Sequence, residues 1–265
     1  MSIDDPTSWR TALGRAWVRA MAHLGATLRR GHRWSVGNVA LVVTMLTGGA
    51  VVAAGTLVAG EVYEGVVTGD DGLSGLDQPV LEASLSMRSP GLDAAITQFT
   101  DVGGTSGMPI LAVSLTIILA LWLRSWTPVW LMSIAVAGSL TLTVLGKDLV
   151  GRLRPPFALA VPPVESSPSF PSGHTLNATV VTSIVLYLAL THLRSYAARA
   201  AVLVLGVAFA GAMGLSRVFL GHHWISDVAA GWAIGIAWAA VVVTAHRVLL
   251  TLRDDGTAAK AASGR

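Results

Sequence analysis

The sequence has no cysteine and few charged residues. Without cysteine it can form neither a disulfide bond nor a thiolate metal site. Charged residues make up only 12% of the 265 residues, which is about half the fraction found in soluble domains. Lysine is especially scarce, with 2 residues against 16 arginines. Because 53% of the residues are hydrophobic, this composition excludes an ordinary soluble enzyme and predicts an integral membrane protein.

Long apolar runs account for most of this hydrophobicity. They cover about residues 36–60, 106–123, 128–145, 175–193, 200–215 and 228–245, and the fifth run is the shortest. Each is close to the length of about 17–20 residues that a membrane-spanning helix needs. The sequence therefore predicts an all-α, polytopic membrane protein with six transmembrane helices.

Three further segments complete the predicted organisation. Residues 1–35 carry six arginines and apolar residues at helical spacing. This pattern predicts an amphipathic cytoplasmic helix, with a mobile basic tail as the alternative. The acidic segment 61–107 predicts one or two short interfacial helices, broken at Ser89-Pro90-Gly91. Residues 36–250 then form the membrane domain, and residues 251–265 are expected to be a disordered cytoplasmic tail.

The distribution of positive charge predicts the orientation in the membrane. With the N-terminus inside, thirteen of the 18 lysines and arginines fall in inner segments and five in outer segments. The positive-inside rule therefore places both termini in the cytoplasm. It places the loops 61–107, 146–174 and 216–227 together on the outer face, and four of the five outer cations lie in the last two. These positions also argue against nucleic acid as a partner, although the net charge is +3.

The last outer loop combines an arginine, a histidine and an aspartate. If residues 223–227 are helical, His223 and Asp227 lie at positions i and i+4 on one face. A carboxylate that accepts the Nδ1 proton of an imidazole leaves Nε2 free to attack a substrate. Arg217 offers a planar charged group that suits phosphate oxygens. The structural alternative is a polar loop that caps two helices. His222 is out of register and is expected to be secondary.

The middle outer loop adds a second pair of cations. Lys147 and Arg154 are seven residues apart, so on a helix they share one face and suit a phosphoryl group. Positive charges at a membrane interface are the alternative explanation. Arg152 is off this face and is expected to extend toward the membrane surface. The six prolines within residues 155–171 predict a stiff, extended cover over the site.

A third stretch, Ser172-Gly173-His174, directly precedes the fourth apolar run. The N-terminus of a helix offers unpaired backbone N–H groups and a partial positive charge to an anion. Gly173 allows a ligand to approach the backbone closely, and Ser172 can donate its hydroxyl or cap the helix. His174 can then act as an acid beside the bound anion, or it can simply be an interfacial capping residue.

Together these three stretches resemble the three-part signature of the type 2 phosphatidic acid phosphatase superfamily. The matching residues are Lys147-x6-Arg154-Pro155, Pro171-Ser172-Gly173-His174 and Ser216-Arg217-x5-His223-x3-Asp227. The resemblance implies a membrane lipid phosphatase that needs no cofactor. It implies that His223 is the nucleophile that forms a phosphohistidine, that Asp227 orients it, and that His174 protonates the leaving oxygen and then activates water. The phosphoryl oxygens would be held by Lys147, Arg154, Ser172, Gly173 and Arg217.

The resemblance and the predicted orientation also suggest the substrate class. A lipid phosphate held in the bilayer of a bacterial plasma membrane would present its head group at the outer face. By analogy with similar bacterial proteins, we expect polyprenyl (undecaprenyl) diphosphate, with phosphatidylglycerophosphate or phosphatidic acid as the alternative. A vanadate-dependent haloperoxidase and a non-catalytic lipid-phosphate binder are alternatives of other classes. A metal site at His174, His222, His223 and Asp227 is a further alternative, but three cations already neutralise the phosphate.

Overall fold

The computed structural model describes residues 36–68 and 72–263. The chain forms two compact units. One takes in the described residues up to Met45 and from Arg247 onward, and the other is Leu46–His246. Every residue of the predicted site belongs to the second unit. The amphipathic helix predicted in residues 1–35 lies outside the described residues.

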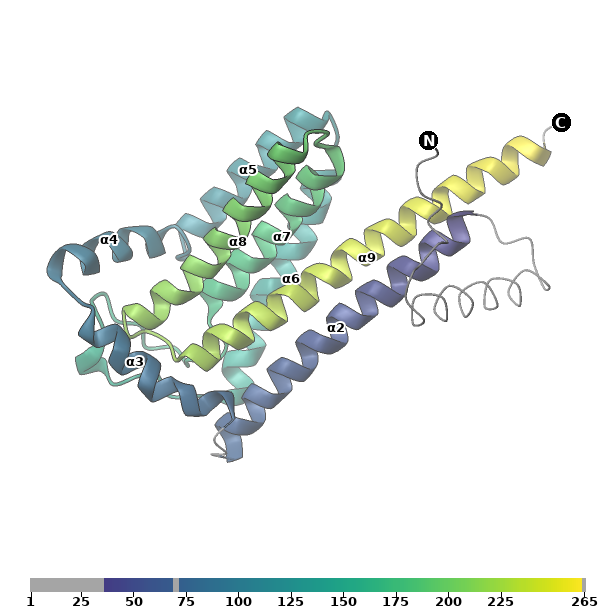
Figure 1. Ribbon diagram of the computed structural model, residues 1–265. Coiled ribbons are helices and arrows are strands. Elements are labelled where there is room, and N and C mark those ends of the chain that lie inside the picture. The colour runs from purple at the N-terminus through teal and green to yellow at the C-terminus, as the bar shows by residue number, and fades with distance from the viewer. Residues whose placement is uncertain (1–35, 69–71, 264–265) are drawn as a thin grey trace, which may run out of the picture. The chain divides into compact units, whose positions relative to one another are not determined.

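All the elements in the described residues are helices, which confirms the all-α prediction. In chain order they are α2 (Val36–Thr68), η1 (Leu73–Leu76), α3 (Asp77–Ser86), α4 (Pro90–Asp101), α5 (Gly107–Leu123), α6 (Thr127–Val150), η2 (Phe157–Leu159), α7 (Gly173–His192), α8 (Tyr196–Phe219) and α9 (Ile225–Ser263) (Figure 1).

The six apolar runs of the sequence all fall on helices. Five helices are long and apolar enough to cross a membrane, namely α2, α6, α7, α8 and α9. The remaining run corresponds to α5, which has 17 residues and so lies at the short end of the range for a span. The shortest of these six helices is therefore α5. The run at 200–215 was the shortest in the sequence, but it lies within α8, which extends beyond it through polar residues at both ends. The short helices expected in the first outer loop are present as α3 and α4.

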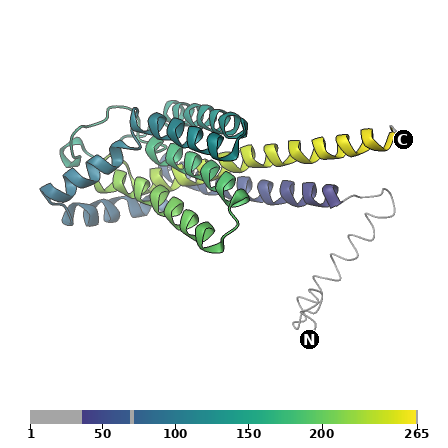
Figure 2. The ribbon, with the colours of Figure 1, turned by 90° about the horizontal axis from the view of Figure 1, so that it is seen from above.

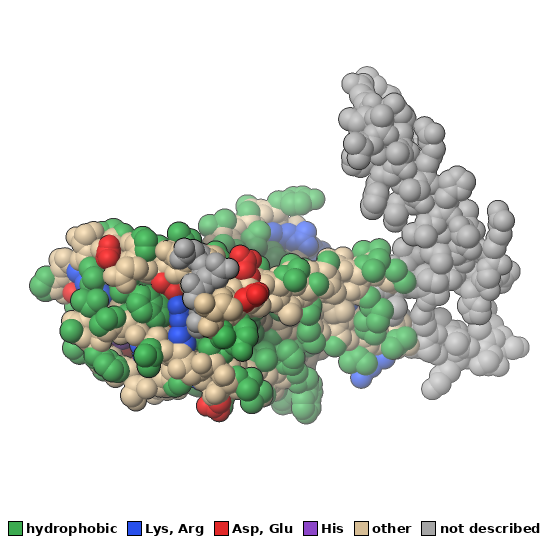
Figure 3. Space-filling model, turned by 90° about the horizontal axis from the view of Figure 1, so that it is seen from below, with side chains coloured by type: hydrophobic (Ala, Val, Ile, Leu, Met, Phe, Trp, Pro, Cys, Tyr) green, Lys and Arg blue, Asp and Glu red, His purple; other side chains and the backbone are tan. Residues whose placement is uncertain are grey.

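Many side chains on the surface of the second unit are apolar, as a bilayer requires. Leu57, Leu121, Leu149 and Trp130 are among the large hydrophobic residues that are exposed. Figure 3 shows hydrophobic side chains spread over one face of the molecule with only a few charged groups between them. This surface agrees with a multi-pass membrane protein.

Helix α7 lies at the centre of the packing. It packs against α5, α6 and α8, whose teal and green ribbons lie side by side in Figures 1 and 2. Leu176, Val180 and Ile184 of α7 are fully buried in the main hydrophobic cluster. The GxxxG pair of α9 faces α7, because a Cβ added at Gly231 would lie 3.0 Å from Thr175 and one at Gly235 would lie 2.9 Å from Thr179.

Two glycine turns bring the motif residues to one end of the bundle. Helix α6 ends at Val150 and is capped by Gly151, which adopts a left-handed φ of 61° and donates its N–H to Lys147 O at 3.0 Å. After α8, Gly221 adopts a φ of 72°, and an added Cβ would lie only 2.7 Å from Leu159 O. Glycine suits both requirements. The second turn delivers His223 to the start of α9.

Helix α9 continues to Ser263, whereas the sequence predicted an unstructured segment from residue 251. No proline interrupts this stretch, and its alanine, leucine, arginine and lysine residues favour a helix. The domain boundaries at residues 35 and 250 stay predictions.

Candidate active site

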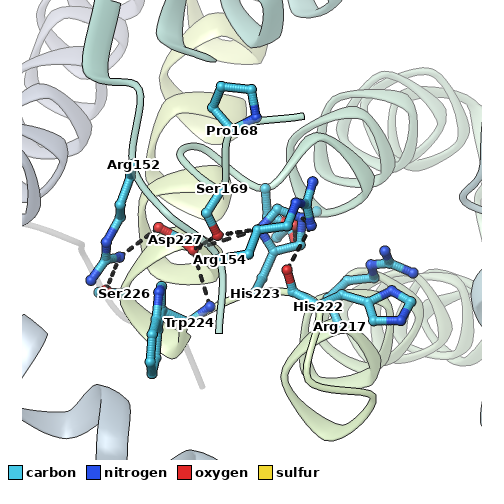
Figure 4. A network of polar contacts seen from close by, with 12 residues as sticks. Arg152, Arg154, Pro168, Ser169, Arg217, His222, His223, Trp224, Ser226 and Asp227 are labelled. Carbon is cyan, nitrogen blue, oxygen red and sulfur yellow. Dashed lines mark hydrogen bonds and ion pairs between the residues drawn. The ribbon is translucent and has the colours of Figure 1, made fainter. Parts of the chain in front are cut away.

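The imidazole of His223 is buried between Asp227 and Arg154 (Figure 4). Its Nδ1 lies 3.6 Å from Asp227 Oδ2, and its Nε2 lies 3.2 Å from Arg154 Nη1. The predicted i, i+4 pair is therefore present, but only Asp227 is helical, because α9 begins at Ile225. Burial lowers the pKa of His223 to about 4, although Asp227 opposes this shift. The imidazole is thus neutral at physiological pH, as a nucleophile requires.

Ser169 connects His223 to Asp227, a role that was not predicted. Its hydroxyl lies 2.5 Å from Asp227 Oδ2 and 3.3 Å from His223 Nδ1. Because the direct distance of 3.6 Å is too long for a hydrogen bond, the serine can bridge the pair by accepting from Nδ1–H and donating to the carboxylate. Ser169 is fully buried. It lies in a loop rich in serine and proline, where a single serine carries no sequence signal.

The prediction for Arg152 was wrong. Its side chain is only 13% exposed, and Nη1 donates to Asp227 Oδ1 at 2.6 Å while Nη2 donates to Asp77 Oδ2 at 2.5 Å. The prediction that Arg152 extends toward the membrane surface assumed that one helix continues from Lys147 to Arg154. Helix α6 ends at Val150, however, and Gly151 turns the chain. For the same reason Lys147 and Arg154 do not share a helix face, although both reach the site.

Two of the three predicted phosphate-binding cations pair with a carboxylate that was not predicted. Glu165 forms ion pairs with Arg154, at 2.7 Å, and with Arg217. Burial raises the pKa of Glu165, but these two guanidinium groups outweigh it and hold the value at about 2. Lys147 Nζ donates to Ser167 Oγ at 3.0 Å and to Pro168 O. Glu165 is the only acidic residue of the proline-rich segment, which is the one signal that singles it out.

The start of α7 brings the remaining predicted residues to the site. Ser172 is the N-cap residue, but its hydroxyl accepts from Thr175 Oγ1 at 2.9 Å and does not cap the helix. Its N–H donates to Asp227 O at 3.2 Å, which joins the first turns of α7 and α9. Gly173 and His174 line a cavity with His223. The turn between α4 and α5 allows the imidazole of His174 to approach, because a Cβ at Gly103 would lie 3.1 Å from its Cδ2.

This cavity has a volume of about 410 Å³ and two chemically different ends. Its polar end is formed by Lys147, Glu165, Ser167, Gly173, His174 and His223. It continues between α5, α6 and α7 along apolar residues, among them Met108, Ala112, Val136, Leu140 and Val181. A cavity of this kind suits a charged head group joined to an apolar tail.

His222 faces away from the centre formed by His223 and Asp227, in agreement with the secondary role expected for it. Its Nε2 lies 2.7 Å from Val161 O, and Figure 4 shows its ring directed away from Asp227. Burial and Arg217 lower its pKa. The alternative metal site would need His222 and Asp227 to bind one ion together. The Asp227 oxygens instead accept hydrogen bonds from Arg152, Ser169 and the N–H of Trp224.

Comparisons with known proteins agree with this arrangement. The profile of the PAP2 superfamily matches residues 127–249, which include all three motif stretches. Phosphatidylglycerophosphatase B of Bacillus subtilis (strain 168) is 31% identical over 161 residues, or 60% of this chain and 78% of the relative.

Two solved structures share the fold. A transmembrane PAP2-type phosphatidylglycerolphosphate phosphatase from Bacillus subtilis has a TM-score of 0.61 at 24% identity, with 79% of this chain and 96% of that chain covered. LpxE of Aquifex aeolicus has a TM-score of 0.50 at 21% identity, with 63% and 94% covered. The fold is thus one that this chain shares with both proteins.

Proposed function

Because this chain belongs to the PAP2 superfamily and is a membrane phosphate-ester hydrolase, we propose that it hydrolyses a lipid phosphate through a phosphohistidine at His223. The observation that carries this proposal is the position of His223. Its Nδ1 side contacts Ser169 and Asp227, while its Nε2 side lies beside Arg154 at the polar end of the cavity.

In the first step, Nε2 of His223 attacks phosphorus and the bond to the lipid oxygen breaks. His174 donates a proton to that oxygen, and the lipid alcohol leaves. The positive charge that develops on the imidazole is stabilised by Asp227 through Ser169. In the second step His174 takes a proton from water, the hydroxyl attacks the phosphohistidine, and inorganic phosphate leaves with His223 restored.

The charge that builds up on the phosphoryl oxygens is stabilised by Lys147, Arg154 and Arg217. Such preorganised donors contribute up to ~3–4 kcal/mol each to lowering the barrier. Ser172 and the Gly173 N–H are the further predicted donors. Glu165 lies between the two arginines, so a phosphoryl group must displace its carboxylate to reach them.

The substrate we propose first is phosphatidylglycerophosphate. A relative named for that activity is 31% identical to this chain, and the apolar part of the cavity suits a lipid tail. Polyprenyl diphosphate, which the sequence analysis placed first, is the second candidate. It is favoured by the charge count, which supports cytoplasmic termini and an outward-facing site in a bacterial plasma membrane.

The test is phosphate release by the purified protein in detergent. The substrates are phosphatidylglycerophosphate, phosphatidate, undecaprenyl diphosphate and undecaprenyl phosphate. We expect the highest kcat/KM with the first of them, and a highest value with either undecaprenyl lipid would reverse the order of the two candidates. His223→Ala should lower kcat by at least about 10³-fold, with His192→Ala, an exposed position at the far end of α7, as the control. Unchanged turnover in His223→Ala would refute the mechanism.

A further inference from the structure

One carboxylate of the segment between α2 and α4 pairs with Arg152 and Ser226, next to the reaction centre. Asp77, the first residue of α3, is only 6% exposed. Its Oδ1 accepts from Ser226 N–H at 2.9 Å, and its Oδ2 accepts from Ser226 Oγ at 2.8 Å and from Arg152 Nη2 at 2.5 Å. A buried carboxylate is tolerated only when it is paired in this way. No part of the proposed mechanism uses Asp77.

Arg152 connects Asp77 to the partner of the nucleophile. Its second nitrogen, Nη1, donates to Asp227 Oδ1 at 2.6 Å and to Ser226 Oγ at 2.7 Å. Figure 4 shows Arg152 on the side of Asp227 opposite to His223. The guanidinium group is therefore shared between two carboxylates, and only one of them faces the histidine.

We propose that Asp77 is a positioning residue for the hydrolysis, because it holds Arg152 in the orientation that leaves Asp227 directed at Ser169 and His223. This inference rests on the proposed function. An arginine with a single carboxylate partner favours a bidentate contact in which both nitrogens donate to it. Without Asp77, Arg152 would turn both nitrogens to Asp227, draw it away from Ser169 and neutralise more of its charge.

The opposing explanation is structural, because Asp77 also accepts from the N–H of Ser226 in the first turn of α9. Such a cap stabilises the helix but has no part in the chemistry. The two roles differ in what they change. A cap affects the fraction of folded protein, whereas a positioning residue affects kcat of the folded protein. Because Asp77 does not line the substrate cavity, neither role predicts a large effect on KM.

Asp77→Asn separates these roles, because it keeps an oxygen for Ser226 N–H and removes the charge that faces Arg152. The matched control is Glu82→Gln, which removes an exposed charge from the same helix. In purified protein, kcat of Asp77→Asn should fall by about tenfold or more, the range for a lost hydrogen bond to a charged group. KM should change by less than about twofold, and Glu82→Gln should retain both constants.

A second variant protects the test against a folding defect. Arg152→Lys keeps the positive charge but lacks the planar fork that bridges two carboxylates. It should show the same fall in kcat at nearly constant KM. The proposal is overturned if kcat per folded molecule is unchanged in both variants, even if their melting temperatures fall. An active His223→Ala variant would instead refute the proposed function itself.

Discussion

Replacing Glu165 with glutamine should strengthen the binding of phosphate-like anions. The carboxylate of Glu165 forms ion pairs with Arg154 and Arg217, and an incoming anion needs the same two guanidinium groups. At neutral pH this carboxylate is ionised, because its pKa is held at about 2. The variant keeps the size of the side chain and removes the competing charge.

The magnitude follows from the strength of these ion pairs. The pKa of about 2 compares with an ordinary value of 4.5, and that difference corresponds to about 3 kcal/mol. Because 33% of the side chain is exposed, solvent screening reduces the attraction to about 1.5 kcal/mol. An anion that no longer competes with this charge should bind about tenfold more tightly.

The assay is inhibition of lipid phosphate hydrolysis by orthovanadate and by inorganic phosphate. The inhibition constants should fall about tenfold in Glu165→Gln and stay constant in Glu82→Gln. Without an anion, Glu165→Gln should also melt at a lower temperature, because Arg217 is buried and loses a counter-charge. Phosphate should restore the melting temperature. Inhibition constants that are unchanged or higher in Glu165→Gln would show that the carboxylate does not compete with the ligand.

Three further outcomes are expected. The value of kcat/KM should fall only below about pH 4, because burial lowers the pKa of His223 to about 4 and the neutral nucleophile is lost below that pH. An acid limb near pH 6.5, as for an unperturbed imidazole, would contradict this. Activity should persist in excess chelator, and loss that only a divalent ion restores would support the metal site. Gly231→Leu should lower the free energy of unfolding by about 1–3 kcal/mol and reduce activity, because its Cβ would meet Thr175 and Ser172 O. The control Gly60→Leu, at a position where the space is open, should change neither. Equal melting temperatures of the two variants would refute the packing argument.

The helices could be predicted from the sequence because a bilayer requires long apolar runs, and each run marks the position of one helix along the chain. The motif residues were also predictable, because their spacing is a local property. Lys147, Arg154, Arg217 and His223 all contact or line the same polar centre, although Lys147 and Arg154 do not share the helix face that their spacing predicted.

The partners of these residues were not predictable for a physical reason. Arg152 is separated from Asp77 and from Asp227 by 75 residues each, and Asp77 lies 149 residues from Ser226. Pairing over such distances depends on how the helices pack, and helical periodicity carries no information about it. Ser169 and Glu165 belong to an irregular loop, where no period exists to indicate which side chain points inward.

The close contact between α7 and α9 restricts how a lipid can reach the centre. A Cβ at Gly231 would lie 3.1 Å from Ser172 O, and one at Gly235 would lie 3.1 Å from Leu176 O. The two backbones leave no room for a hydrocarbon chain between α7 and α9, so a lipid cannot enter from the bilayer between these two helices. The apolar part of the cavity lies instead between α5, α6 and α7, where residues such as Ala112, Leu140 and Val181 leave room for a lipid tail.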